Sequence, residues 1–289
     1  MTERWIIVPD LHGSLHALEA IVGHYQLLTA DGRWRDHRVG LIQLGDVIDR
    51  GPDTPGCLRL IRYLQHQATA ANARLVRLLG NHELLLLQGI ETFSSWTGVE
   101  EERRRLRAEM VTGRIVAAIA VRRWLAIHGG INITQLSLLT ATEGKPLRTP
   151  SAISRRLNRM VHDAATHFQF HGPIFETGLN GPAGPFWAYL GDSVSDIPLQ
   201  FSQVVGHRIV EEPTSFLDDQ GRPALVQLDT GIFRKPTDTP FWVAEIDHDQ
   251  FSLVKLETAQ LSTGRAWFQT VTLQSPESPQ SAIESQFLE

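Results

Sequence analysis

The chain has 289 residues, and its 27 Lys and Arg stand against 32 Asp and Glu, which gives a formal net charge of −5. This mixed, slightly acidic balance argues against duplex nucleic acid as the main partner. Cys57 is the one cysteine, so an intramolecular disulfide and a thiolate zinc cage are both excluded. Any bound metal must therefore be held by histidine, carboxylate or amide groups, and the chain has 12 histidines.

The sequence predicts neither a membrane span nor a secretory leader. A span needs roughly eighteen or more apolar residues without charges, and no run approaches that length. The first eight residues lack a basic segment followed by a long apolar run, and they are typical of a β-strand instead. We therefore expect a cytoplasmic protein with no membrane partner.

The first eighty residues alternate between patterns typical of strands and patterns typical of helices. Short apolar, β-branched runs alternate with longer segments whose apolar residues recur at helical spacing. The expected elements are a strand over 4–8, a helix from 15 to about 28, a strand over 39–44, a helix over 55–70 and a strand over 74–79. This order predicts an α/β fold with a parallel sheet.

The remainder of the chain is less regular. Residues 82–123 form a mostly helical segment, and its charged run over 100–109 predicts a solvated helix face or a helical hairpin. We expect one catalytic domain over 1–274, with 82–123 and the aromatic Gly/Pro loop 170–200 as insertions, and a flexible tail over 275–289. The other expected elements are a strand over 124–128, a helix over 149–168, and a second, largely antiparallel sheet from strands at 203–206, 224–228, 241–246 and 251–256.

Histidines and carboxylates gather where predicted strands end. Because ligands of open α/β sheets bind beyond the carboxyl ends of the strands, we expect these groups to converge. Oxygen and imidazole ligands suit a pair of Mn, Fe or Zn ions that act on a phosphoryl group. In this interpretation Asp46 bridges two ions. The candidate ligands are Asp10, His12, Asp46, Asn81, His128 and His207.

Three further polar residues accompany these candidate ligands without being needed to hold metal. Arg50 offers a planar fork that can bind two phosphate oxygens. His82 can protonate a leaving oxygen, and Asp49 can orient the imidazole and raise its proton affinity.

The motifs as a set resemble the calcineurin-like metallophosphoesterases, and within them the phosphoprotein phosphatase branch. The most similar members are the bacterial-type Shewanella-like protein phosphatases. The resemblance covers about residues 4–232 and includes the DTG at 229–231. The stretches that carry it are Asp10–Leu15, LIQLGDVIDRGP at 41–52, LLGNHE at 78–83 and VGHR at 205–208.

This resemblance implies a ββ-sandwich flanked by helices, with four layers in the order α-β-β-α. It implies a phosphatase with two divalent ions, manganese first and Fe, Zn, Co or Ni as alternatives, that hydrolyses phosphomonoesters by in-line attack of a metal-bridging hydroxide. The substrate would be a phosphorylated protein, at Ser/Thr or Tyr, or a small phosphoester. It assigns Asp10, His12 and Asp46 to one ion, and Asp46, Asn81, His128 and His207 to the other. His82 would be the general acid supported by Asp49, and the substrate contacts would come from Arg50, Asn81, Trp187 and Tyr189.

Two positions depart from the family pattern. Pro9 replaces the usual Gly, and the loop through Trp187 and Tyr189 lacks a second phosphate-binding Arg. Two other functions remain open. One is hydrolysis of dinucleoside polyphosphates, with Trp187 stacking on a base. The other is a non-catalytic metal-bound binding protein, although the intact His82 and Asp49 argue against it.

Overall fold

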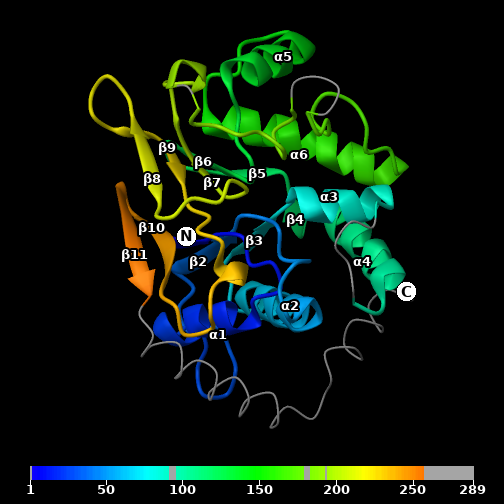
Figure 1. Ribbon diagram of the computed structural model, residues 1–289, viewed down its shortest axis with the longest axis vertical. Coiled ribbons are helices and arrows are strands. Elements are labelled where there is room, and N and C mark those ends of the chain that lie inside the picture. Colours follow the sequence, from blue (N-terminus) through cyan, green and yellow to red (C-terminus); the bar gives the residue numbers. More distant parts are fainter. Residues whose placement is uncertain (1, 91–95, 179–182, 193, 257–289) are drawn as a thin grey trace.

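The computed structural model describes residues 2–90, 96–178, 183–192 and 194–256. Two sheets face each other in the middle of the molecule, and helices cover the outer face of each (Figure 1). The expected two-sheet α/β fold flanked by helices is therefore confirmed. The predicted tail over 275–289 lies outside the described residues, and the single-domain division over 1–274 stays a prediction.

The first sheet is six-stranded with the order β11-β10-β1-β2-β3-β4. Strands β1 to β4 are parallel, whereas β10 is antiparallel to β1 and β11 is antiparallel to β10. The bounds are β1 Arg4–Val8, β2 Val39–Gln43, β3 Leu75–Leu78, β4 Ile115–Val116, β10 Phe241–Asp247 and β11 Gln250–Leu256.

The second sheet is five-stranded with the order β5-β6-β7-β9-β8. Its central strands β6, β7 and β9 are parallel, and β5 and β8 are antiparallel edge strands. The bounds are β5 Ala118–Val121, β6 Trp124–Ile127, β7 Ser202–Val205, β8 Thr214–Leu217 and β9 Pro223–Gln227. Each sheet therefore contains a set of adjacent parallel strands.

Helices α1 and α2 lie on the outer side of the first sheet, and α5 and α6 lie on the outer side of the second (Figure 1). None of the helices in the described ranges is long and apolar enough to cross a membrane. The helices are α1 Leu15–His24, α2 Thr54–Ala70, α3 Asn81–Gln88, α4 Val99–Val111, α5 Ile133–Glu143 and α6 Pro150–His167, with short 3-10 helices η1 Val194–Asp196 and η2 Ile232–Arg234.

Alternation of side chains along the strands divides the apolar core into two regions. On β1, Trp5 and Ile7 join the region between the sheets, while Ile6 and Val8 join the region beneath the helices. Successive strand residues point to opposite faces, so one buried strand supplies both regions. The sheets are held together by the first region, which includes Ile42, Leu78, Trp124, Val204, Val226 and Ile246.

Three sequence-based expectations need correction. The strands at 203–206, 224–228, 241–246 and 251–256 do not share a largely antiparallel sheet, because β10 and β11 complete the first sheet and β7 and β9 are parallel in the second. The segment 82–123, predicted to be mostly helical, also contains strands β4 Ile115–Val116 and β5 Ala118–Val121, and helix α5 over Ile133–Glu143 was not predicted. The sheet that each strand joins depends on pairing between residues far apart in the sequence, such as Ile6 and Glu245. Local sequence patterns do not contain that information.

The charged run over 100–109 is only partly a solvated face. Glu102 and Glu109 are 6% and 8% exposed, and both bind Arg62 of α2. Glu109 also lies 2.9 Å from Arg77, which is 1% exposed on β3. Burial opposes the charge of Glu109, but Arg77 and Arg62 outweigh it and lower its pKa to about 2. This stabilisation is present above the ordinary glutamate pKa and is lost as the pH falls towards 2.

Replacing Glu109 with Gln is expected to reduce the free energy of unfolding by about 3 kcal/mol, because the buried Arg77 loses its counter-charge. Urea denaturation followed by circular dichroism measures the change. Glu101→Gln is the matched control on the same helix, since Glu101 pairs with Arg104 and Arg105 at the surface. That control is expected to cost less than about 0.5 kcal/mol, and equal costs for the two variants would contradict the interpretation.

Candidate metal centre

The carboxyl ends of six parallel strands meet at one edge of the sandwich. Strands β1, β2 and β3 lead into the segments of Asp10, Asp46 and Asn81, and strands β6 and β7 lead into those of His128 and His207. The sixth strand, β9, leads into Asp229. The structure therefore brings the predicted strand-end residues together, as the general rule for such sheets requires. Asp10, His12, Asp46, Asn81 and His128 are each at most 3% exposed.

The loops that present these side chains have an uncommon backbone conformation. Ten described non-glycine residues have a positive φ, and five of them are predicted site residues. This left-handed region is unfavourable for residues with a Cβ and persists where the surroundings enforce it, often at functional sites. The five are His12, Asp46, Asp49, Arg50 and His207.

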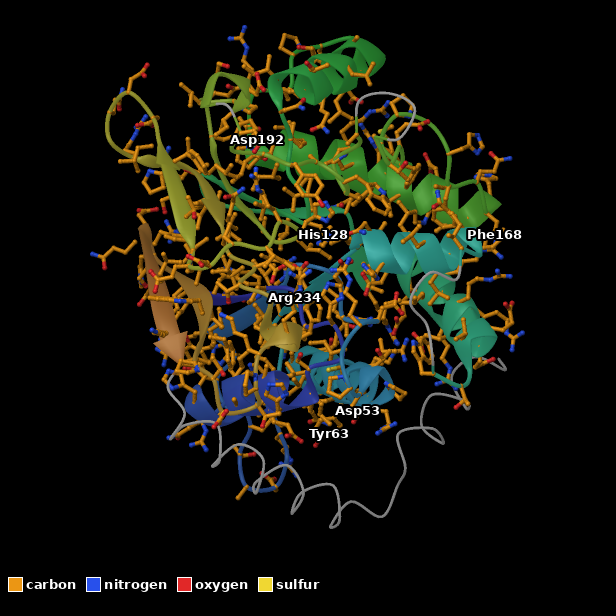
Figure 2. All side chains as sticks on the ribbon, viewed as in Figure 1. Asp53, Tyr63, His128, Phe168, Asp192 and Arg234 are labelled. Carbon is orange, nitrogen blue, oxygen red and sulfur yellow. The ribbon has the colours of Figure 1, made fainter. Side chains whose placement is uncertain are left out.

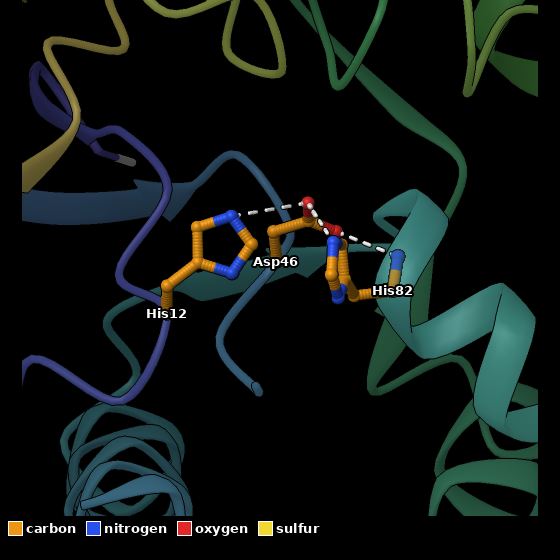
Figure 3. Close-up of side chains that lie close together, drawn as sticks. All are labelled: His12, Asp46 and His82. Carbon is orange, nitrogen blue, oxygen red and sulfur yellow. Dashed lines mark hydrogen bonds and ion pairs between the residues drawn. The ribbon is translucent and has the colours of Figure 1, made fainter. Parts of the chain in front are cut away.

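Two groups of potential ligand atoms share one carboxylate. His12, Asp46 and His82 form one group, and Asp46, His128 and His207 form the other, with the ligand atoms of each group within 4.8 Å of one another. Figure 3 shows the Asp46 carboxylate between the imidazoles of His12 and His82. Asp46 thus occupies the position that a bridging ligand requires.

The hydrogen bonds of two histidines define which ring nitrogen faces Asp46. Nδ1 of His12 lies 2.9 Å from the Ile48 carbonyl, and Nδ1 of His128 lies 2.9 Å from the Leu44 carbonyl. Because a carbonyl only accepts, each Nδ1 carries the proton. The Nε2 atoms, which lie 3.5 and 3.6 Å from Asp46 Oδ2, then carry the free lone pairs. Lone pairs and a carboxylate that face each other in a buried site are suited to a cation between them.

Burial keeps the candidate histidine ligands neutral. Loss of hydration lowers the pKa of His12 to about 4 and the pKa of His207 to about 3, and it also lowers the pKa of His128. A neutral imidazole is the form that binds a metal ion. These three residues are therefore ready to act as ligands near neutral pH.

The centre also gathers buried carboxyl groups that repel one another electrostatically. Burial, followed by the nearby Asp229 and Asp46, holds the pKa of Asp10 well above its ordinary value. Asp10 lies outside both ligand groups, yet its buried Oδ1 has no hydrogen-bond partner and lies 3.9 Å from His128. An orphaned carboxylate oxygen beside neutral imidazoles fits divalent cations, because these supply the missing positive charge.

His82 and Asp49 form the hydrogen bond that the sequence predicts. His82 Nδ1 donates to Asp49 Oδ2 at 2.8 Å, and His82 Nε2 lies 4.0 Å from Asp46 Oδ2. Burial opposes protonation of His82, but Asp46 and Asp49 outweigh that effect and raise its pKa above the ordinary value. Arg50 lies beside this pair, with Nη1 3.3 Å from His12 Nε2.

The two predicted aromatic contacts lie beside the second group. The ring of Tyr189 is 4.9 Å from the ring of His207, and Tyr189 is 62% exposed. Trp187 is 6.1 Å from the same imidazole and is half-buried. Their substrate-binding role stays a prediction, although both are placed where a substrate could reach them.

Glu83 is a positioning residue that the sequence interpretation did not include. Its buried carboxylate accepts the backbone N–H groups of Asp46 and Val47 at 2.8 Å each and that of Gly80 at 3.0 Å. Asp46 in turn accepts the backbone N–H of His82 at 2.9 Å. Glu83 therefore joins the loop after β2 to the start of α3. Its place three residues after Gly80 is a helix-start signal that could have revealed it.

Asp229 and Phe233 also belong to the centre and lacked an assigned role. Asp229 is 1% exposed, and burial raises its pKa to about 6. Its Oδ1 accepts the N–H of Gly231 at 2.8 Å, which fixes the turn into η2. Phe233 on η2 packs against His12 with ring centroids 4.7 Å apart. The DTG motif was the available signal for the first residue, and no local pattern marks the second.

Comparison with known proteins yields one family and several partial relatives. The family model described as calcineurin-like phosphoesterase matches residues 4–204. Shewanella-like protein phosphatase 1 of Plasmodium berghei is 37% identical over 84 residues, which are 29% of this chain and 23% of that protein. Shewanella-like protein phosphatase 2 of Arabidopsis thaliana is 29% identical over 99 residues, 34% of this chain and 25% of that protein. The chain thus spans about a quarter of the length of these curated relatives.

A solved structure extends the likeness in fold over most of the chain. The cold-active protein-tyrosine phosphatase of a psychrophilic Shewanella species superposes with a TM-score of 0.62 over 89% of this chain and 81% of that chain. The two sequences are 17% identical, so this likeness concerns the fold alone.

Replacing Gly206 with Ala is expected to weaken manganese binding about 10- to 100-fold. An added Cβ would lie 2.0 Å from Asp10 Oδ1, so the Asp10 carboxylate must move. Isothermal titration calorimetry with MnCl₂ measures the affinity, and Asp46→Asn is the reference for loss of the shared ligand. Gly113→Ala is the control, because its open turn has φ +70° and no atom within 4 Å of the added Cβ. Wild-type affinity in Gly206→Ala would show that Asp10 does not contribute to the site.

Proposed function

The chain belongs to the calcineurin-like phosphoesterase family, and from this premise we propose that it is a phosphatase with two divalent ions that hydrolyses phosphomonoesters. The single observation that carries the proposal is that Asp46 belongs to two groups of potential ligand atoms, one of which contains His82, the hydrogen-bond partner of Asp49. Two cations on either side of one carboxylate suit phosphoryl transfer, and the adjacent imidazole suits acid catalysis.

The residues of the chain would hold the two ions in the arrangement that the sequence predicts. When bound, the ions would polarise the phosphoryl group and make water a stronger nucleophile at neutral pH. Manganese is our first expectation because the ligands are oxygen and imidazole groups. Asp10, His12 and Asp46 would hold one ion, and Asp46, Asn81, His128 and His207 the other. Asn81 Oδ1 lies 2.8 Å from His128 Nε2 and 2.9 Å from His207 Nδ1, which supports its place in the second set.

His82 would donate the proton that the leaving oxygen needs. Asp49 accepts a hydrogen bond from Nδ1 of His82. This bond holds the imidazole with its Nε2 atom towards Asp46. The pKa of His82 is raised above its ordinary value, which favours the imidazolium form that can donate a proton. Asp49 acts here as a positioning residue, since it orients the acid and does not itself face the reacting atoms.

Arg50 would bind oxygens of the phosphoryl group at the opening of the site. It is exposed at the end of the loop after β2, and its guanidinium lies against His12. A guanidinium can donate two parallel hydrogen bonds to a phosphate, which orients the group as well as attracting it. Tyr189 would contact the organic part of the substrate from the other side, beside His207.

We further propose phosphorylated Ser/Thr or Tyr side chains as the substrate class and the cytoplasm as the location. The two Shewanella-like relatives described above are named as protein phosphatases, which supports this substrate class. The exposed positions of Arg50 and Tyr189 at the two sides of the buried centre would let a side chain on a protein surface reach it.

A substrate panel tests the proposed function. Protein with manganese is expected to release phosphate from p-nitrophenyl phosphate and to lose this activity on chelation, because the buried carboxylates lose their counter-charge. Phosphotyrosine, phosphoserine and phosphothreonine peptides are compared with diadenosine tetraphosphate by phosphate release and chromatography. Faster turnover of the nucleotide would replace the protein phosphatase proposal with the dinucleoside polyphosphate alternative. Manganese binding without turnover of any substrate would favour a binding protein.

The variant His82→Asn is expected to reduce kcat on p-nitrophenyl phosphate by about 10²- to 10⁴-fold, the range for loss of a general acid. Its manganese affinity should remain close to that of the wild type, because His82 is not assigned as a ligand. Steady-state kinetics and calorimetry measure the two quantities. A parallel loss of manganese affinity would instead make His82 a ligand, in keeping with its place in the group with His12 and Asp46.

A further inference from the structure

Two arginines from distant parts of the chain lie over one aromatic ring at the centre. The guanidinium carbon of Arg50 is 5.4 Å from the centroid of the Phe233 ring, and that of Arg234 is 5.3 Å from the same centroid. Cations are attracted to an aromatic face at such distances. Phe233 itself packs against His12. One ring therefore holds two cationic side chains next to a predicted metal ligand.

The DTG turn at 229–231 fixes the backbone that presents Arg234. Asp229 Oδ1 accepts the N–H of Gly231, and the Gly231 carbonyl accepts the N–H of Arg234 at 2.9 Å. Gly231 has φ +67°, a conformation that glycine adopts without strain. Arg234 thus follows a turn anchored on a buried carboxylate and lies on η2, where Figure 2 labels it.

The charge of Arg234 reaches the interior of the centre and is not taken up by an acidic neighbour. Both Arg50 and Arg234 act to lower the pKa of Asp229, which burial otherwise raises. Among the described residues, no carboxylate forms an ion pair or a hydrogen bond with the exposed Arg234. Its guanidinium is therefore available to an anionic ligand.

The other arginine beside the centre is already engaged. Nη1 of Arg208 donates to the Leu190 carbonyl at 3.2 Å and lies 2.5 Å from Asp192 Oδ1. These two contacts stabilise the loop that carries Tyr189. In addition, the sequence has no Lys or Arg between Arg159 and Arg208, so the aromatic loop supplies no cation of its own.

We propose that Arg234 is the second phosphate-binding guanidinium of this site, and that Phe233 aligns it with Arg50 on the dianion of a phosphomonoester. This inference rests on the proposed phosphatase function and names the residue that completes its substrate contacts. A monoester dianion offers more negative charge and more terminal oxygens than one guanidinium can satisfy. The two arginines would bind these oxygens from the side of His12.

The test compares Arg234→Ala with Arg234→Lys and with Lys235→Ala, all loaded with manganese. Lys235→Ala is the matched control, because it removes one charge from the next position without touching the group over Phe233. For Arg234→Ala we expect KM for p-nitrophenyl phosphate and the inhibition constant of inorganic phosphate to rise about tenfold. Arg234→Lys should recover part of the loss, and Lys235→Ala should stay within about twofold of the wild type.

A second readout separates phosphate binding from a structural role. Bis(p-nitrophenyl) phosphate carries one negative charge, so Arg234→Ala should reduce its kcat/KM less than that of the monoester. Manganese affinity measured by calorimetry should not change. Unchanged inhibition by inorganic phosphate in Arg234→Ala, or an equal loss in Lys235→Ala, would overturn the proposal.

The role of Arg234 in phosphate binding can be tested even if the protein proves not to be a phosphatase. If the wild type does not hydrolyse any phosphoester, the affinity of its manganese form for inorganic phosphate can still be measured by calorimetry. Weaker phosphate binding in Arg234→Ala would then support an anion-binding site at Arg234 in a protein that has no phosphatase activity. Equal phosphate binding in the two proteins would reject Arg234 whether or not the wild type is active.

Discussion

The Asp46 carboxylate is the interaction on which the rest of the centre depends. Oδ1 accepts a backbone N–H from the start of α3, and Oδ2 faces the Nε2 atoms of His12 and His128. The segments that follow β1 and β3 of the first sheet and β6 of the second thus meet at the side chain of Asp46. Since the imidazoles of His12 and His128 are neutral, they do not balance the charge of Asp46, and the arrangement is suited to holding cations. The buried sheet edges supply the rigidity, and Asp46 supplies the common point.

Holding Asp46 in this position requires support from outside the group of ligands. Its φ of 53° is unfavourable for a residue with a Cβ, and Glu83 secures the loop by accepting the backbone N–H groups of Asp46 and Val47. Gly80 lies so close that an added Cβ would be 2.1 Å from Asp46 Oδ1. Close packing therefore requires glycine at Gly80. The unfavourable φ angles of the loops are maintained by the two sheets from which the loops extend.

The sequence predicts which polar residues gather at the sheet edge better than it predicts how the strands are divided between the sheets. Asp10, Asp46 and Asn81 each come shortly after an apolar strand, which a local sequence pattern reveals. Because the ends of parallel strands lie at one edge of the sheet, residues with this pattern come together in the fold. The assignment of β10 to the first sheet depends on pairing between Ile6 and Glu245, which no local pattern records. The same holds for the contact of Arg50 with Phe233, and for Glu109 on a charged helix that becomes buried only when α4 packs on Arg62 and Arg77.

The charges around the centre are unevenly distributed, and this bears on the class of substrate. Arg50 and Arg234 both lie over Phe233 on the side of His12, while the side of His207 carries the ring of Tyr189. A phosphomonoester matches this division, because its negative charge is gathered at one end and its organic group at the other. A dinucleoside polyphosphate spreads several negative charges along its length, and part of that chain would lie over the aromatic loop 170–200, which has no Lys or Arg. The unequal surroundings of the two metal-ligand groups therefore favour a compact anion joined to a neutral or aromatic group.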